Sequence, residues 1–167
     1  MQDEVKIRDP FSIVPIGIIH SPFTDIIGMP IQPTGARGIR GTVEISGEYA
    51  EGLTDIEGFS HLFLIYAFHR CVSYQLTVIP FLDTIPRGVF ATRAPRRPNP
   101  IGLSIVRLIE VRGTTLLIED VDILDGTPLL DLKPYVPLFD AYPEASSGWL
   151  EHSANGAGSF RSDGRFR

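Results

Sequence analysis

The chain has 167 residues, a length typical of one domain whose core is large enough to fold without disulfides or metals. Hydrophobic residues make up 43% and charged residues only 21%, which excludes a largely disordered chain. The single cysteine, Cys71, excludes an internal disulfide, and no Cys/His cluster is present for zinc, so we expect no metal and a reducing, cytoplasmic location. The sequence contains no signal peptide and no apolar run near the roughly 18 residues of a spanning helix, so we expect no membrane segment.

Short β-strands separated by Gly and Pro are predicted along most of the chain, because apolar and β-branched residues recur in short runs or alternate with polar ones. The predicted strands cover residues 12–20, 39–45, 61–68, 74–81, 88–92, 103–111, 115–123 and 129–135. Only one or two short helical turns are expected, including residues 48–53. This pattern predicts an all-β sandwich or barrel. It also argues against a Rossmann fold, since no strand is followed by G-x-G-x-x-G.

The composition changes at Ser146, after which Gly and Ser are common and aliphatic residues are rare. We therefore predict a folded domain over residues 1–145 and a flexible Gly/Ser-rich tail over residues 146–167. An ordered terminal clasp is the alternative interpretation.

Arginines are concentrated in the middle of the chain, although the net charge is −5. No acidic residue lies between Asp83 and Glu110, whereas five arginines do: Arg87, Arg93, Arg96, Arg97 and Arg107. Within this stretch, Pro95, Pro98 and Pro100 stiffen a loop that carries Arg93, Arg96, Arg97 and Asn99. A stiff loop loses little entropy on binding, and arginine suits carboxylates and phosphates, so the loop is a candidate ligand clamp. The alternative is a rigid, solvated surface turn.

Two further stretches contain candidate ligand groups. Asp125-Gly126-Thr127-Pro128 is a turn by composition, and its backbone and carboxylate are suited to an amine or to ribose hydroxyls. His69 follows the apolar run at 61–68 and is a candidate ligand contact or proton acceptor. The simpler alternatives are a turn without a ligand and a histidine bonded to a backbone carbonyl.

Four blocks of the chain resemble a known family. They are Ile16-Gly17-Ile18-Ile19-His20-Ser21-Pro22-Phe23, Gly58-Phe59-Ser60-His61-Leu62 through Phe68-His69-Arg70, Gly88-Val89-Phe90-Ala91-Thr92-Arg93 with Arg97-Pro98-Asn99-Pro100-Ile101-Gly102, and Leu124-Asp125-Gly126-Thr127-Pro128 through Asp131-Leu132-Lys133-Pro134-Tyr135. In order and content these blocks resemble the TsaA-like (YaeB-like) family of TrmO-type tRNA methyltransferases. Longer members of that family carry a C-terminal domain after this barrel, and this chain resembles a short form without it.

The resemblance implies a compact β-barrel, S-adenosyl-L-methionine as the cofactor, a homodimer, and methylation of N6 of N6-threonylcarbamoyladenosine next to the tRNA anticodon. It places the cofactor contacts on Ile31, Gln32, Pro33, His69, Arg70, Arg93, Leu103, Asp125, Gly126, Thr127 and Pro128. For tRNA we expect Arg96, Arg97 and Asn99, and by residue type alone the candidate bases are His69, Lys133 and Tyr135. Two alternatives remain, namely a module that only binds S-adenosyl-L-methionine and a methyltransferase for a small-molecule acceptor.

Overall fold

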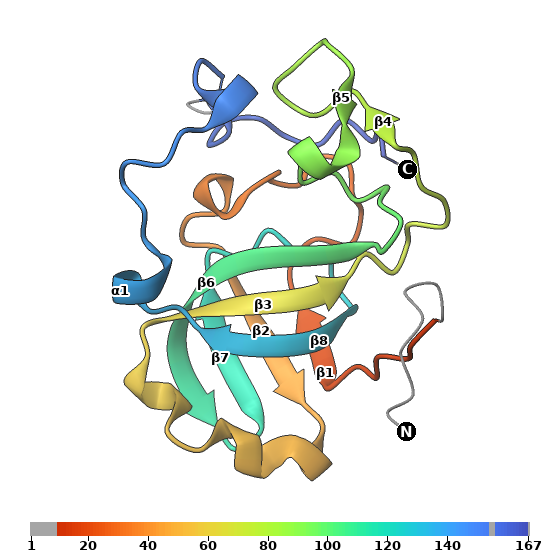
Figure 1. The fold of residues 1–167 in the computed structure, drawn as a ribbon. Helices are drawn as coiled ribbons and strands as arrows, with labels where there is room; N and C mark the ends of the chain where they lie inside the picture. Colours follow the sequence, from red (N-terminus) through yellow and green to blue (C-terminus); the bar gives the residue numbers. More distant parts are fainter. Residues whose placement is uncertain (1–9, 154–155, 167) are drawn as a thin grey trace, which may run out of the picture.

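A closed β-barrel forms the body of the molecule (Figure 1). The computed structural model describes residues 10–153 and 156–166. Six strands close the barrel in the order β1-β2-β7-β6-β3-β8, and every neighbouring pair is antiparallel. Their bounds are β1 Gly17–His20, β2 Arg40–Ile45, β3 His61–Ala67, β6 Ile101–Arg112, β7 Thr115–Glu119 and β8 Thr127–Pro134. The predicted all-β barrel is confirmed.

The strands β3 and β6 run side by side over the whole length of β3, from the pair His61 and Arg107 to the pair Ala67 and Ile101. Side chains alternate between the two faces of each strand, so Leu62 and Leu64 lie fully buried inside the barrel while Phe63 points outward. The continuous apolar run at 61–68 is typical of a strand buried on both faces, but the outward side chains of this barrel strand are only half-buried.

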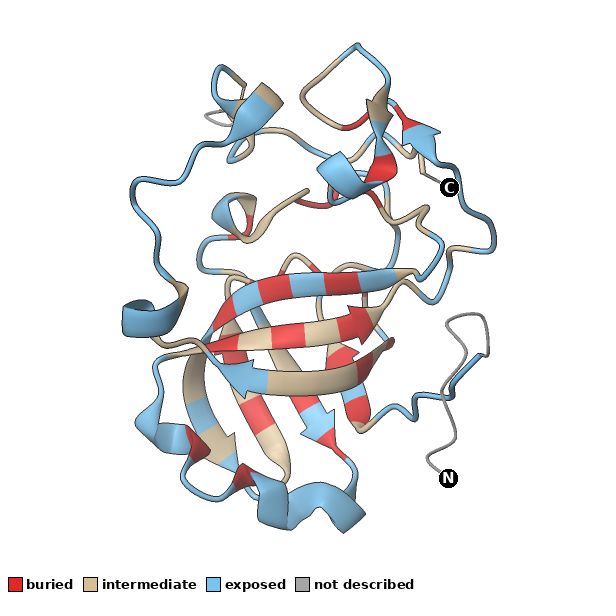
Figure 2. Ribbon diagram, viewed as in Figure 1, coloured by how far each residue is buried: buried red, intermediate tan, exposed pale blue. Residues whose placement is uncertain are grey.

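The core fills the barrel interior with branched apolar side chains from all six strands (Figure 2). Its fully buried members include Ile19, Val43, Leu62, Leu64, Val106, Leu116, Ile118 and Leu129. Below the barrel, the 3-10 turns η2 (Gly47–Leu53) and η3 (Ile56–Gly58) add Leu53 and Ile56 to this core. The helical turns predicted at 48–53 are present, as 3-10 helix.

A layer of loops covers the other end of the barrel (Figure 1). It contains the two-residue strands β4 (Thr77–Val78) and β5 (Arg87–Gly88), which pair with each other, and the 3-10 turn η4 (Val89–Ala91). The strand predicted at 74–81 is thus reduced to two residues, and most of the strand predicted at 88–92 is a 3-10 turn. Likewise β1 begins only at Gly17, because Pro15 has no amide for a strand ladder.

The C-terminal segment crosses this loop layer after the short helix α1 (Pro137–Asp140) and the 3-10 turn η5 (Gly148–Leu150). Its Arg161 forms a β-bridge with Pro30, and the ring of Phe166 packs with the small apolar cluster of Val78, Val89 and Ala94. These are contacts of the kind that the clasp alternative requires. Among residues 10–153 and 156–166, no helix has the length and apolar character needed to cross a membrane.

Candidate functional site

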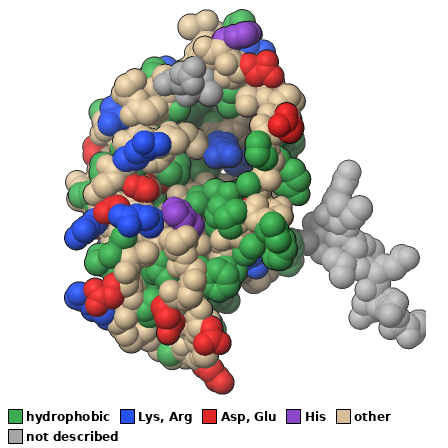
Figure 3. Space-filling model, turned by 90° about the vertical axis from the view of Figure 1, so that its left-hand side faces the viewer, with side chains coloured by type: hydrophobic (Ala, Val, Ile, Leu, Met, Phe, Trp, Pro, Cys, Tyr) green, Lys and Arg blue, Asp and Glu red, His purple; other side chains and the backbone are tan. Residues whose placement is uncertain are grey.

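A cavity of about 780 Å³ lies between the covered end of the barrel and the loop layer. This size falls in the range of about 300–1,000 Å³ that is usual for small-molecule sites. A hollow is also visible on the face of the molecule shown in Figure 3. The lining comes from five parts of the chain: residues 25–32, the end of β3 with residues 68–71, residues 80–103, residues 122–127 and the C-terminal segment.

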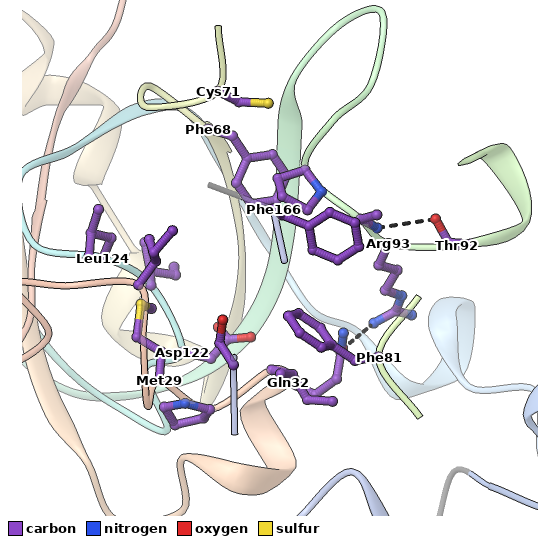
Figure 4. A pocket seen from close by; sticks show the side chains of 18 of the residues that line it. Met29, Gln32, Phe68, Cys71, Phe81, Thr92, Arg93, Asp122, Leu124 and Phe166 are labelled. Carbon is purple, nitrogen blue, oxygen red and sulfur yellow. Dashed lines mark hydrogen bonds between the residues drawn. The ribbon is translucent and has the colours of Figure 1, made fainter. Parts of the chain in front are cut away.

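Most of the lining is apolar, with a few polar groups pointing inward (Figure 4). The labelled apolar side chains are Met29, Phe68, Phe81, Leu124 and Phe166. Figure 4 shows the carboxylate of Asp122 pointing into the cavity from the side opposite Arg93. Such a lining favours a ligand with a flat apolar part and a small number of charged or hydrogen-bonding groups.

Three polar side chains form a hydrogen-bonded chain at the cavity, of which Tyr66 and Asp122 line it and Ser104 is buried behind it. The Tyr66 hydroxyl lies 3.1 Å from the Ser104 hydroxyl, and Ser104 Oγ donates to Asp122 Oδ1 at 2.7 Å. Gly102 makes room for this arrangement, because a Cβ at that position would overlap the ring of Tyr66. Burial raises the pKa of Tyr66 far above its usual value, so the phenol stays protonated and acts as a hydrogen-bond donor. Burial also raises the pKa of Asp122 to about 6, although the hydrogen bond from Ser104 opposes the shift.

The proline-braced loop holds two arginines in different ways. Arg93 Nη1 donates to Gln32 Oε1 at 3.0 Å, which joins this loop to the segment before the 3-10 turn η1 (Pro33–Gly35). Arg97 Nη1 donates to the backbone carbonyls of Val89, Thr92 and Ala94 at 3.1, 2.8 and 3.3 Å. The guanidinium of Arg97 therefore holds the loop together, whereas Arg93 presents its side chain at the cavity.

His69 lies at the cavity mouth, directly after β3 and the half-buried Phe68. Partial burial and then the neighbouring Arg70 lower the pKa of the imidazole, while a hydrogen bond with the Ala67 carbonyl opposes the shift. The ring is therefore neutral at physiological pH. The imidazole thus lines the cavity and is also bonded to a backbone carbonyl.

The comparisons with known proteins agree with this geometry. The sequence model of the tRNA-methyltransferase O N-terminal domain matches residues 18–141, which include all six barrel strands except the first residue of β1. The chain belongs to this family.

Relatives in three organisms illustrate the range of the family. A Pyrococcus abyssi protein named a probable S-adenosyl-L-methionine-binding protein is 57% identical over 91% of this chain and 83% of its own length. The tRNA (adenine(37)-N6)-methyltransferase of Escherichia coli is 35% identical over 84% of this chain and 64% of its own length. The crystal structure of TrmO from Pseudomonas aeruginosa is 40% identical, with a TM-score of 0.72 over 84% of this chain and 63% of that one. The chain thus spans less than two thirds of the length of the latter two relatives.

Seven of the side chains expected at the family's cofactor site line the cavity: Ile31, Gln32, His69, Arg70, Arg93, Leu103 and Thr127. Four others lie outside the lining, namely Pro33, Asp125, Gly126 and Pro128. Asp125 instead accepts a hydrogen bond from the Ser21 amide at 3.1 Å and lies 3.3 Å from His20 Nδ1. Its carboxylate therefore fixes the turn before β8.

The remaining candidates are distributed over the surface. Lys133 pairs with Asp131 at 2.7 Å, and the ring of Tyr135 packs against Phe63 with centroids 5.5 Å apart, so both lie on the outside of the barrel and away from the cavity. Arg96 and Asn99 are on the proline-braced loop but are not part of the cavity lining, whereas Arg97 is.

The lining also includes side chains that lie outside the four blocks that carry the family resemblance. They include Met29, Phe81, Asp122, Trp149 and Phe166. Asp122 alone carried a usable signal, since it is an acid between the apolar residues Val121 and Ile123, both of which are buried. The others come together only through contacts between distant parts of the chain.

Proposed function

We propose that this protein transfers a methyl group from S-adenosyl-L-methionine to N6 of N6-threonylcarbamoyladenosine next to the anticodon of tRNA. The observation that carries the proposal is the largely apolar cavity with Arg93 and Asp122 facing it, in a barrel of the tRNA-methyltransferase O family. The Escherichia coli relative is named a tRNA (adenine(37)-N6)-methyltransferase, which supports both the reaction and the position of the acceptor. Action on tRNA, together with the single unpaired Cys71, supports a cytoplasmic location.

The cofactor is S-adenosyl-L-methionine, and the residues present suit it. Apolar side chains such as Phe68, Phe81 and Phe166 are suited to the adenine ring and the aliphatic chain. Arg70 and Arg93 are suited to its carboxylate, and the backbone at Thr127 to polar edges. When bound, the cofactor supplies a methyl group already activated on a sulfonium, so the protein mainly aligns the reacting atoms and removes a proton.

The acceptor carries a threonyl carboxylate and lies within a polyanion, so it needs cations near the cavity mouth. Within residues 10–153 and 156–166, the side chains of Arg70 and Arg96 make no hydrogen bond or ion pair. Arg87, by contrast, pairs with Asp83 at 2.8 Å. Of the residues expected at tRNA, Arg96 is therefore our first candidate, because the guanidinium of Arg97 is bonded to the loop's own carbonyls.

A homodimer is part of the proposal, and the outer face of β3 and β6 is the proposed interface. Leu103 and Ile105 are 49% and 37% exposed, and they pair in register with Ile65 and Phe63 of the neighbouring strand. Neighbouring exposed apolar side chains of this kind favour a contact with another protein surface. Because Leu103 also lines the cavity, a second copy on this face would reach the cavity rim.

A second candidate function is binding of S-adenosyl-L-methionine without methyl transfer. It is favoured by the Pyrococcus abyssi relative, which is 57% identical and is named only as a probable binding protein. Transfer to a small-molecule acceptor is the third alternative. The candidates differ in their products, so one assay separates them.

The deciding experiment incubates the purified protein with cofactor carrying a labelled methyl group and with tRNA that holds the threonylcarbamoyl modification. Matched tRNA without the modification is the control. We expect label in the N6-methylated nucleoside, identified by mass spectrometry after digestion, only from the modified tRNA. Tight cofactor binding without any labelled nucleoside would instead support the binding module.

A further inference from the structure

The carboxylate of Asp122 lies inside the cavity, and the proposed methyl transfer has so far no assigned proton acceptor. Its side chain is half-buried, lies on the residues that lead from β7 to β8, and faces the cavity (Figure 4). Besides Asp122, the acids of the described lining include only Asp25. A carboxylate held inside a largely apolar cavity costs free energy unless it is bonded, so its presence calls for an explanation.

We propose that Asp122 is the catalytic base that takes the proton from the acceptor nitrogen during methyl transfer, and that Ser104 and Tyr66 are its positioning residues. The inference rests on the proposed function and names the group that performs its proton transfer.

The direction of the hydrogen bonds supports this assignment. Since Ser104 Oγ donates its proton to Asp122 Oδ1, its contact with Tyr66 must be one in which the phenol donates. Ser104 thus holds one carboxylate oxygen, and Tyr66 orients the Ser104 hydroxyl. Among the described residues, no other side chain donates to this carboxylate; besides Ser104, only its own backbone amide is bonded to it, and the group faces the cavity.

The charges around Asp122 suit a base that works near neutral pH. Burial raises its pKa to about 6, while the Ser104 hydroxyl and, more weakly, Arg93 favour the ionised form. The carboxylate is therefore mostly ionised at pH 7 and yet more basic than an exposed one, which is the condition that favours general-base catalysis. Tyr66, the titratable group joined to Asp122 through Ser104, stays protonated.

The chemistry balances without a further reactant. The nitrogen of the carbamoylated adenosine forms a bond to the methyl carbon, the methyl–sulfur bond breaks, and its electron pair stays on the departing sulfur. The N6 proton moves to the carboxylate of Asp122, which neutralises the positive charge that would otherwise develop on nitrogen. The proton is later lost to water when the product leaves.

His69, the sequence-based candidate that does line the cavity, is less suited to this role. The ring is exposed at the mouth, and the hydrogen bond with the Ala67 carbonyl engages one of its nitrogens. Its lowered pKa makes it a weaker base than an ordinary histidine. We expect it to contact ligand rather than to accept the proton.

The test compares Asp122→Asn with the wild type and with the control Asp55→Asn. Asp55 is exposed at the opposite end of the barrel, and its positive φ of 66° is a conformation that asparagine tolerates. We expect Asp122→Asn to lower kcat by about 10²–10⁴-fold, the usual effect of removing a general base. The cofactor Kd from calorimetry and the melting temperature should remain those of the wild type.

The pH dependence separates a base from a merely structural carboxylate. Wild-type kcat/KM should rise with pH through about 6 and then level off, because the group acts only when ionised. Ser104→Ala removes a hydrogen bond that favours the ionised form, so the rising limb should move to higher pH. A carbon-13 NMR titration of the Asp122 carboxyl in cofactor-free protein should show the same displacement without any assay of activity.

Three results would overturn the proposal. An active Asp122→Asn protein with an unchanged pH profile would exclude a base at this position while leaving the methyltransferase intact. Loss of cofactor binding in that variant would make Asp122 a cofactor ligand instead. A wild type that transfers no methyl group to modified tRNA would refute the proposed function itself, and with it this role for Asp122.

Discussion

The backbone of Ser162 pairs with that of Met29, although 133 residues separate them in the chain. Ser162 N donates to Met29 O at 2.9 Å, and Gly28 N donates to Ser162 O at 2.8 Å. These two hydrogen bonds hold the C-terminal segment against a loop that lines the cavity, and they bring the ring of Phe166 into the lining. The segment therefore forms part of the cavity wall.

Phe166→Ala is expected to weaken cofactor binding. Complete burial of a phenylalanine contributes about 1.5–3 kcal/mol, and Phe166 is half-buried, so we expect a loss of about 1 kcal/mol, or roughly fivefold in Kd. Calorimetry with S-adenosyl-L-methionine measures this change. Phe139→Ala is the matched control, because Phe139 is 68% exposed and lies outside the lining. An equal Kd for both variants would show that the segment does not contact the cofactor.

Arg97→Ala is expected to destabilise the fold. Its guanidinium donates to three backbone carbonyls of the proline-braced loop and lies 5.9 Å from the centre of the Phe90 ring. Losing this charged donor should cost about 2–3 kcal/mol. At about 2–4 °C for each kcal/mol, the melting temperature should fall by roughly 4–12 °C.

Arg97→Lys should not restore the lost stability, because an ammonium cannot reproduce the planar fork of the guanidinium. Arg112→Ala serves as the control, since Arg112 is an exposed residue that pairs with Glu110 in the hairpin between β6 and β7. Normal melting of Arg97→Ala together with weaker tRNA binding would return Arg97 to the role that we expected from the sequence.

Arg96→Ala is expected to weaken tRNA binding without affecting the cofactor. The side chain is half-exposed on the loop and outside the cavity lining, so phosphate is its natural partner. Loss of one phosphate contact should flatten the slope of log Kd against log salt by about 0.7–0.9. Titrations at several salt concentrations, with Arg112→Ala as the control, measure this slope. An unchanged slope would place the tRNA on another face.

The barrel was predictable from the sequence because its strands are governed by local patterns. Apolar residues alternate along β6 and β7, and Arg112-Gly113-Thr114 lies at their connection, where Gly113 adopts a φ of 60°. Gln32, Arg93 and Leu103, to which the resemblance assigns cofactor contacts, line one cavity. In both cases short stretches of sequence carry the information.

The rest of the site depends on contacts between residues that are distant in the chain. The Gly/Ser-rich composition after Ser146 predicts flexibility, and nothing in it indicates the pairing of Ser162 with Met29. Arg97 was a candidate ligand contact because arginine often binds anions. The direction of its guanidinium depends, however, on how the loop folds, since the loop turns three backbone carbonyls toward it. The orientation of Asp122 depends on its hydrogen bond with Ser104 of β6, which no local pattern around residue 122 reveals.

Gly102→Ala tests whether the hydrogen-bonded wall of the cavity depends on close packing. A methyl group at this position would overlap the ring of Tyr66, which is 6% exposed and cannot move into solvent without opening the barrel end. We expect a loss of about 1–3 kcal/mol of stability, the usual cost of overpacking a core. The displaced ring should also break the contact between Tyr66 and Ser104, so the NMR titration of Asp122 should change in this variant. Tyr66→Phe provides the matching comparison, since it removes the same hydrogen bond and leaves the packing intact. If Gly102→Ala melts like the wild type and Asp122 titrates normally, the Tyr66 ring can shift without a loss of stability, and the orientation of Asp122 does not depend on Tyr66.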